Sequence, residues 1–139
     1  MFSKKCADTY VLRLEKGEEI VETIKAFCTG ENLLCAEVSG IGAVGAATLG
    51  FYDVGTKEYS KTVVEGPLEM VSLLGSVTQK DGEPYLHLHA SFSGKDCNCI
   101  GGHLNSAVIS LTGEIFLRKI DGSVGRRAQE ETGINILDL

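Results

Sequence analysis

The sequence contains no tryptophan, only two prolines, and fewer basic than acidic residues. Two prolines beside 17 glycines are typical of a turn-rich sheet domain whose strands approach one another closely. The 13 lysines and arginines against 19 acidic residues give a net charge of −6. This balance argues against nonspecific nucleic-acid binding, which depends on clustered cations. The short basic pairs Lys4-Lys5 and Arg126-Arg127 do not reverse it and are interpreted as solvated surface.

Long apolar runs and targeting segments are also missing. The opening residues, MFSKKCADTY, lack the hydrophobic region of a signal peptide. The most apolar stretch, 33–52, is interrupted by Glu37 and by glycines, so it predicts strands rather than a membrane span. Five cysteines without regular spacing predict free thiols in a reducing compartment. We therefore expect a cytoplasmic protein that does not associate with membranes.

Apolar periodicity predicts one helix followed by many strands. Residues 16–32, KGEEIVETIKAFCTGEN, place apolar side chains on one helical face. The length suits one domain, 1–139, with an N-terminal arm at 1–8 and a C-terminal tail or strand at 123–139. The expected class is α+β, a mostly antiparallel, barrel-like sheet with one main helix packed on it. Strands are expected at 10–14, 33–40, 46–54, 59–66, 68–79, 84–93, 106–120 (one or two strands, with a bulge at Gly113) and 131–139.

A glycine-rich segment, SGIGAVG, joins two of these expected strands. It contains the G-x-G-x-x-G spacing at Gly40, Gly42 and Gly45. A strand-like run follows it instead of a helix start, and this context excludes a dinucleotide-binding fingerprint. We interpret the segment as a tight connection between strands.

All three histidines lie between positions 84 and 104, in PYLHLHASFSGKDCNCIGGHL. On a strand, the side chains of 86, 88, 90 and 92 face the core, and His87 and His89 point to the opposite face. Residues two apart on a strand are separated by ~6.6 Å, so two imidazoles there reach one ion. His103 supplies a third ligand if the intervening loop reverses the chain. Gly101 and Gly102, just before it, permit a close backbone approach.

Three histidines with an open fourth position are a known arrangement for zinc that also binds water or a ligand. Two alternatives stay open. The H-x-H pair also arises by chance on a strand surface, and Cys97 and Cys99 form a C-x-C pair that offers thiolate ligands. The competing interpretation of these two cysteines is free thiols in an accessible loop.

The segments GPLEMVSLLGSV, PYLHLHASFSG and GGHLNSAV together resemble the PPC domain, the plants and prokaryotes conserved domain. The resemblance extends over nearly the whole chain. It implies a mixed α/β fold with a large antiparallel sheet, similar to acetolactate decarboxylase, and assembly as a homotrimer. It also implies that His87, His89 and His103 bind zinc or another divalent metal. The CNC segment before Gly101 is not a feature of the family.

In plants, this domain follows AT-hooks in DNA-binding proteins, so the resemblance implies a DNA-binding or transcription-regulatory role. The present sequence has no Arg-Gly-Arg-Pro hook, the element that enters the A·T minor groove. Together with the net charge, its absence argues against direct DNA binding. We therefore expect a trimeric regulatory binding module that contacts protein partners.

Two other functions remain open. A three-histidine metal site could serve a lyase or decarboxylase acting on a small keto or hydroxy acid, or it could hold the subunits of a trimer together. An enzyme also needs an acid or base and a group that holds an anionic substrate. The sequence offers Glu65, Glu69 and Glu114 for the first role, and Arg13 and Arg118 for the second.

Overall fold

The computed structural model describes all 139 residues and contains one helix and eight strands. No helix combines the length and apolar character that a membrane crossing requires. The elements follow one another as β1 (Phe2–Cys6), β2 (Thr9–Glu15), α1 (Ile20–Gly30), β3 (Ala36–Asp53), β4 (Glu58–Lys80), β5 (Glu83–Ser93), β6 (Cys99–Lys119), β7 (Gly125–Gln129) and β8 (Ile134–Asp138).

The strands form one sheet in the order β1-β2-β6-β3-β4-β7-β8, and β5 pairs with both β4 and β6. The four long strands therefore close a cycle of pairings, from β3 to β4, β5, β6 and back to β3. All of these pairings are antiparallel, and only the short contact between β4 and β7 is parallel. This confirms the expected class, a mostly antiparallel, barrel-like sheet with one helix.

Strands β3 and β4 are longer than the sequence predicts. The expected pairs 33–40 with 46–54, and 59–66 with 68–79, are each one continuous strand, β3 and β4. The expected connection at Gly40–Gly45 is therefore wrong, because these residues lie inside β3. Its pairing register shifts at two places, between Gly40 and Gly42 and between Val44 and Ala46. Such bulges bend and twist a strand without ending it, which allows β3 to curve around the core.

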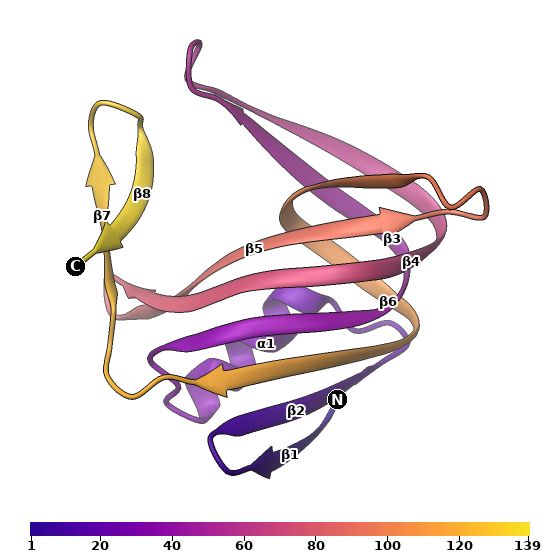
Figure 1. Cartoon of the computed structure of the whole chain (residues 1–139), viewed down its shortest axis with the longest axis horizontal. Coiled ribbons are helices and arrows are strands. Elements are labelled where there is room, and N and C mark those ends of the chain that lie inside the picture. Colours follow the sequence, from indigo (N-terminus) through magenta and orange to yellow (C-terminus); the bar gives the residue numbers. More distant parts are fainter.

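Helix α1 covers one face of the sheet, behind the strands in Figure 1. It lies inside the predicted range, and its buried residues Ile20, Ile24 and Cys28 belong to the predicted apolar face. They join the single hydrophobic core, whose largest fully buried members include Phe92 on β5 and Leu12 on β2. The opposite face of the sheet carries no helix.

The two ends of the chain also pair as strands. The expected N-terminal arm is instead β1, which pairs with β2 from Phe2 to Cys6. The C-terminal segment forms the β7–β8 hairpin, and the long hairpin between β3 and β4 projects beside it (Figure 1). The space between these two hairpins contains the candidate site.

Candidate metal centre

The sheet brings all three histidines together on neighbouring strands. His89 on β5 lies directly opposite His103 on β6, and His87 precedes His89 by two residues on β5. The core positions on β5, Leu88, Ala90 and Phe92, are buried. The alternation predicted from the sequence is therefore confirmed, and the imidazoles lie on the face away from the core.

The ring positions fit a single metal ion. The ring centroids are 5.2 Å apart for His87 and His89, 5.3 Å for His87 and His103, and 5.5 Å for His89 and His103. One nitrogen from each ring lies within 4.8 Å of the others. Zinc–nitrogen bonds of about 2.0–2.1 Å at tetrahedral angles place ring centroids roughly 5 Å apart. A small inward movement of the three rings is therefore enough for coordination.

The surroundings favour neutral imidazoles, which is the form that binds metals. Partial burial lowers the pKa of His87, and the positive charges of Arg126 and the neighbouring histidines lower it further. Partial burial also lowers the pKa of His103, and His89 adds to this effect. Neutral nitrogen donors without a carboxylate suit zinc and similar transition metals better than calcium or magnesium, which prefer oxygen ligands.

Glycines allow the strands to approach closely at this point. A Cβ on Gly102 would lie 3.0 Å from the backbone oxygen of Gly50, and one on Gly101 would lie 2.9 Å from that of Ala90. The predicted close approach is therefore present, but Gly101 and Gly102 are residues of β6 and not of a loop. The turn before them is shorter than the sequence suggests because pairing with β5 already begins at Cys99.

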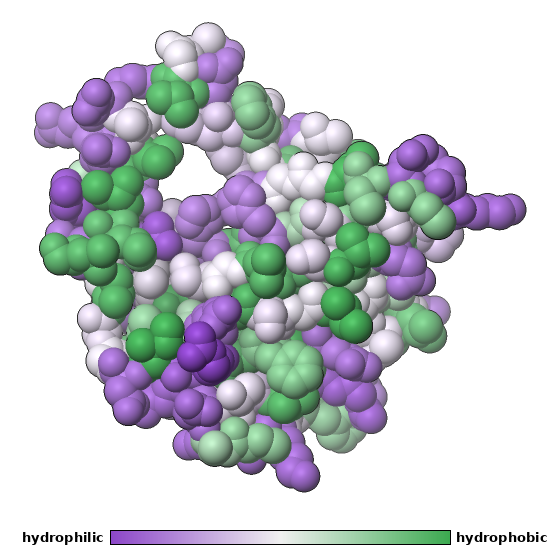
Figure 2. Space-filling model, in the orientation of Figure 1, coloured by the Kyte–Doolittle hydropathy of each residue, from purple (hydrophilic) through white to green (hydrophobic).

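The three histidines lie in a cavity of about 600 Å³. Its opening is visible in Figure 2 between the two projecting hairpins, bordered by both hydrophilic and hydrophobic side chains. The strands β3, β4, β5 and β6 supply most of the lining and the β7–β8 hairpin supplies the rest. The lining residues other than the histidines are Gly50, Phe51, Tyr52, Tyr59, Tyr85, Gly102, Arg126, Gly133, Ile134 and Asn135.

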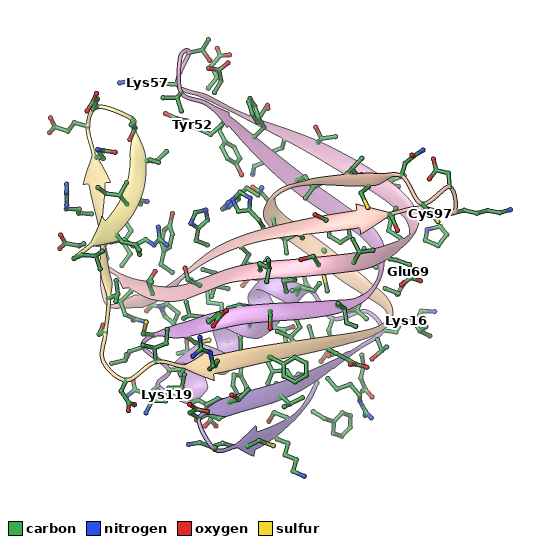
Figure 3. The ribbon with its side chains drawn as sticks, in the orientation of Figure 1. Lys16, Tyr52, Lys57, Glu69, Cys97 and Lys119 are labelled. Atoms are coloured by element: carbon green, nitrogen blue, oxygen red, sulfur yellow. The ribbon has the colours of Figure 1, made fainter.

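A hydrogen bond joins the two hairpins that border the cavity. Tyr52 extends from the β3–β4 hairpin toward the β7–β8 hairpin (Figure 3), and its hydroxyl donates to the backbone oxygen of Thr132 at 2.6 Å. Gly133 makes room for this contact, since its φ is +76° and a Cβ there would lie 2.8 Å from the Tyr52 oxygen. Lys57 Nζ lies 3.5 Å from the backbone oxygen of Glu130 and adds a second link.

Tyrosines form part of the cavity wall beside the imidazoles. The Tyr59 ring lies 6.2 Å from the His103 ring in an edge-on arrangement. Its hydroxyl accepts a hydrogen bond of 2.7 Å from Asn105 Nδ2. Gly50 makes this placement possible, because a Cβ there would overlap the Tyr59 hydroxyl.

Sequence reasoning missed Arg126, which lines the cavity. The pair Arg126-Arg127 was interpreted as solvated surface, and this holds only for Arg127, which is exposed and pairs with Asp138. Adjacent residues of a strand point to opposite faces. The final strand-like segment therefore carried a signal that one of the two arginines faces inward.

The other sequence candidates lie outside the cavity lining. Cys97 and Cys99 are exposed free thiols, and the cluster that can hold a metal contains histidines alone. Arg13 pairs with Glu15, and Arg118 pairs with Glu37. Glu69 and Glu114 line a separate groove, and Glu65 lies in β4 opposite Ala46.

The fold and this site define a class of protein, a closed antiparallel sheet domain with a three-histidine centre in an open cavity. The sequence profile of the Plants and Prokaryotes Conserved (PCC) domain matches residues 1–121. The chain therefore belongs to this family. The β7–β8 hairpin lies beyond the matched residues. A search of curated proteins gives no match.

Solved structures support the assignment. A metal-containing protein from Archaeoglobus fulgidus is 34% identical, with a TM-score of 0.88 over 100% of this chain and 99% of that chain. A protein from Bacteroides thetaiotaomicron, described as a candidate DNA-binding protein, is 31% identical, with a TM-score of 0.96 over 99% and 96% of the two chains. Acetolactate decarboxylase from Bacillus subtilis is 12% identical, with a TM-score of 0.57 over 79% and 52%. This last likeness shows the fold alone.

Proposed function

We propose that this chain is a metal-containing binding module with a regulatory role, and that His87, His89 and His103 hold zinc or another divalent transition metal. The observation that carries the proposal is the convergence of three imidazoles in a cavity large enough for a small molecule. The metal-containing relative from Archaeoglobus fulgidus supports it. The five free cysteines support placing the protein in a reducing compartment, the cytoplasm.

A metal bound by three histidines supplies a Lewis acid with a position open to a ligand. The protein residues determine which ligand reaches that position. Tyr59 and Tyr85 form part of the wall, and the Tyr52 hydrogen bond to Thr132 holds the hairpins at the entrance. A ligand that binds here contacts both the sheet and the β7–β8 hairpin, which is a physical basis for a regulatory response.

Cobalt titration tests the metal site directly. Untagged protein treated with a chelator is titrated with Co²⁺ while its visible d–d absorption is followed. One equivalent should give the intense bands of tetrahedral cobalt, and a subsequent equivalent of Zn²⁺ should remove them. The variant His103→Ala should lose the bands. Equal bands in His103→Ala and the parent protein would contradict the assignment of this residue as a ligand.

We further propose that the protein is a homotrimer whose subunits cover the helix-free face of the sheet. Large apolar side chains are exposed on this face, and Figure 2 shows hydrophobic side chains over its middle. Two grooves run along it, one of about 420 Å³. An exposed apolar face of this kind favours self-association. The exposed side chains that border the grooves are Ile41, Val71, Leu74, Leu111 and Phe116.

Sedimentation or gel filtration tests the trimer. Leu111 on β6 is 73% exposed at the groove, and Val63 on β4 is 63% exposed and lies outside both grooves. We expect Leu111→Glu to give monomers, because it buries a charge in the interface, while Val63→Glu remains trimeric. Monomers from the parent protein would contradict the proposal. An unchanged trimer after chelation would show that the metal does not hold the subunits together.

Direct DNA binding is not part of this proposal, although the Bacteroides thetaiotaomicron protein is described as a candidate DNA-binding protein. The chain carries a net charge of −6 and no AT-hook, so its 13 lysines and arginines are outnumbered by acidic residues, which disfavours phosphate binding. We expect no gel retardation of duplex DNA at physiological salt. Retardation that weakens steeply with rising salt would contradict this expectation and would assign a phosphate-binding surface to the assembly.

A metal-dependent lyase acting on a small keto or hydroxy acid is the second candidate. The cavity beside the three histidines favours it. No aspartate or glutamate lines this cavity, so Glu65, Glu69 and Glu114 are not placed to act as its acid or base. Metal-dependent turnover of a 2-keto or 2-hydroxy acid by the purified protein would favour the enzyme over the regulatory module.

A further inference from the structure

Arg126 is the one arginine of the chain that has no carboxylate partner. The chain contains 19 acidic residues, and its other three arginines each pair with one of them, Arg13 with Glu15, Arg118 with Glu37 and Arg127 with Asp138. Arg126 is half-buried and lines the cavity that contains the three histidines. A half-buried charge normally has a partner of opposite charge.

Neutral groups hold the Arg126 guanidinium in place. Its Nε donates to Thr78 Oγ1 at 2.9 Å, and its Nη1 donates to the backbone oxygen of Asn135 at 3.1 Å. Its Nη2 lies 3.4 Å from Ser76 Oγ, and the group stacks 4.8 Å from the centre of the Tyr85 ring. These contacts use three of the five N–H groups of a guanidinium. One N–H remains on each terminal nitrogen, and two such donors match the two oxygens of a carboxylate.

The charge of the cavity lining also favours an anion. Its lining contains three histidines and one arginine but no aspartate or glutamate. A divalent metal on the histidines adds further positive charge. The cavity therefore favours an anion with two functional groups, one for the arginine and one for the metal. Its volume of about 600 Å³ is in the usual range for small-molecule sites.

We propose that Arg126 binds the carboxylate of a small organic acid, and that a second, oxygen-containing group of this acid faces the three-histidine site. This inference rests on the proposed metal site and names the class of ligand that the site takes. It also assigns a role to the β7–β8 hairpin, because Arg126 lies on β7 and is anchored to Asn135 on β8. The hairpin provides the positive group that the sheet lacks at this cavity.

Lactate and lactamide form a matched pair of probes, since both carry the 2-hydroxyl group and only lactate carries a charge. Binding of each to zinc-loaded protein is measured by NMR titration at constant ionic strength, with inorganic phosphate as a comparison anion. The variant Arg126→Gln removes the charge. The neighbouring variant Arg127→Gln removes an exposed charge from the same strand and serves as the control.

We expect lactate to bind the parent protein and Arg127→Gln equally, and to bind Arg126→Gln at least about tenfold more weakly because a charge-assisted pair is lost. Lactamide should bind all three proteins weakly. Equal binding of lactate and lactamide by the parent protein would overturn the inference, and this comparison does not depend on the folding of a variant. Undiminished lactate binding by Arg126→Gln, or tighter binding of phosphate than of lactate, would also overturn it.

The same titration on chelator-treated protein separates this inference from the metal site. If the histidines hold no metal, lactate binding is the same before and after chelation but still depends on Arg126. If the metal is present and Arg126 is not the anion site, chelation weakens lactate binding while Arg126→Gln does not. The two proposals therefore fail in different ways.

Discussion

Gly75 shows how single residues build the site. It lies on β4 opposite Leu88, and a Cβ there would be 2.0 Å from the backbone oxygen of His87 and 2.9 Å from the Leu88 Cα. Only the absence of a side chain at Gly75 allows β4 to pair this closely with β5, the strand that carries His87 and His89. The position of His87 therefore depends on a glycine that is not itself a ligand.

The substitution Gly75→Ala should lower the free energy of unfolding by about 1–3 kcal/mol, because the backbone of β5 must move to accommodate the methyl group. Zinc affinity should fall as well, since His87 moves with its strand. Urea unfolding and zinc titration measure the two effects. Gly45→Ala is the control, because its Cβ would make an ordinary 3.7 Å contact with Ser110. Equal stability and zinc affinity in the two variants would refute this role of Gly75.

Cys28 gives a second prediction at the residue scale. Burial raises the pKa of its thiol from 9.0 to about 12. An unfolded chain therefore loses this proton near pH 9 while the folded chain retains it, so the free energy of unfolding should fall as pH rises from about 9 to 12. Cys28→Ala should show a shallower decrease over this range in urea unfolding. If the free energy of unfolding fell equally steeply with pH in the variant and the parent, the Cys28 thiol would not be the source of this pH dependence.

At the scale of elements, Glu19 connects α1 to the sheet. Its side chain accepts hydrogen bonds from the backbone nitrogen of Glu22, at 2.6 Å, and from that of Ala107 on β6, at 2.8 Å. One carboxylate thus caps the helix and satisfies a strand donor. The apolar pattern of the sequence predicts the helix, but the link from Glu19 to a residue 88 positions away follows only from the folded chain.

Replacing Glu19 by alanine should cost about 2 kcal/mol of stability, since it removes a helix cap and leaves a backbone donor of β6 unpaired. Thermal or urea unfolding measures the loss. Glu22→Ala is the matched control, because this side chain is exposed in the same helical turn. A loss in Glu19→Ala no larger than that in Glu22→Ala would contradict the dual role.

At the scale of the whole molecule, local patterns account for the helix and for the core face of β5. They also account for the cluster of three histidines, because alternation on one strand and a return segment suffice to bring the rings together. The continuity of β3 and β4 was not predictable from composition, since glycines inside a strand resemble a turn until a partner strand shows them to be bulges.

The cavity was not predictable for a related reason. Its lining combines residues from the middle of the chain with the β7–β8 hairpin near the C-terminus. The hairpin reaches the sheet through a single parallel contact, between Gln79 and Gly125, and through hydrogen bonds such as that of Tyr52 to Thr132. No local period indicates these contacts. The sequence alone therefore predicts a surface position for Arg126.

The metal content of untagged protein, measured by elemental analysis, tests the central claim most directly. Three proteins are compared: the parent, His87→Ala, and a Cys97→Ser/Cys99→Ser double variant that removes the neighbouring thiols. We predict one divalent transition-metal ion per chain in the parent and in the double variant, and a large loss in His87→Ala. A parent protein that retains no metal after incubation with excess Zn²⁺ and dialysis, or a His87→Ala variant that retains as much as the parent, would contradict the account.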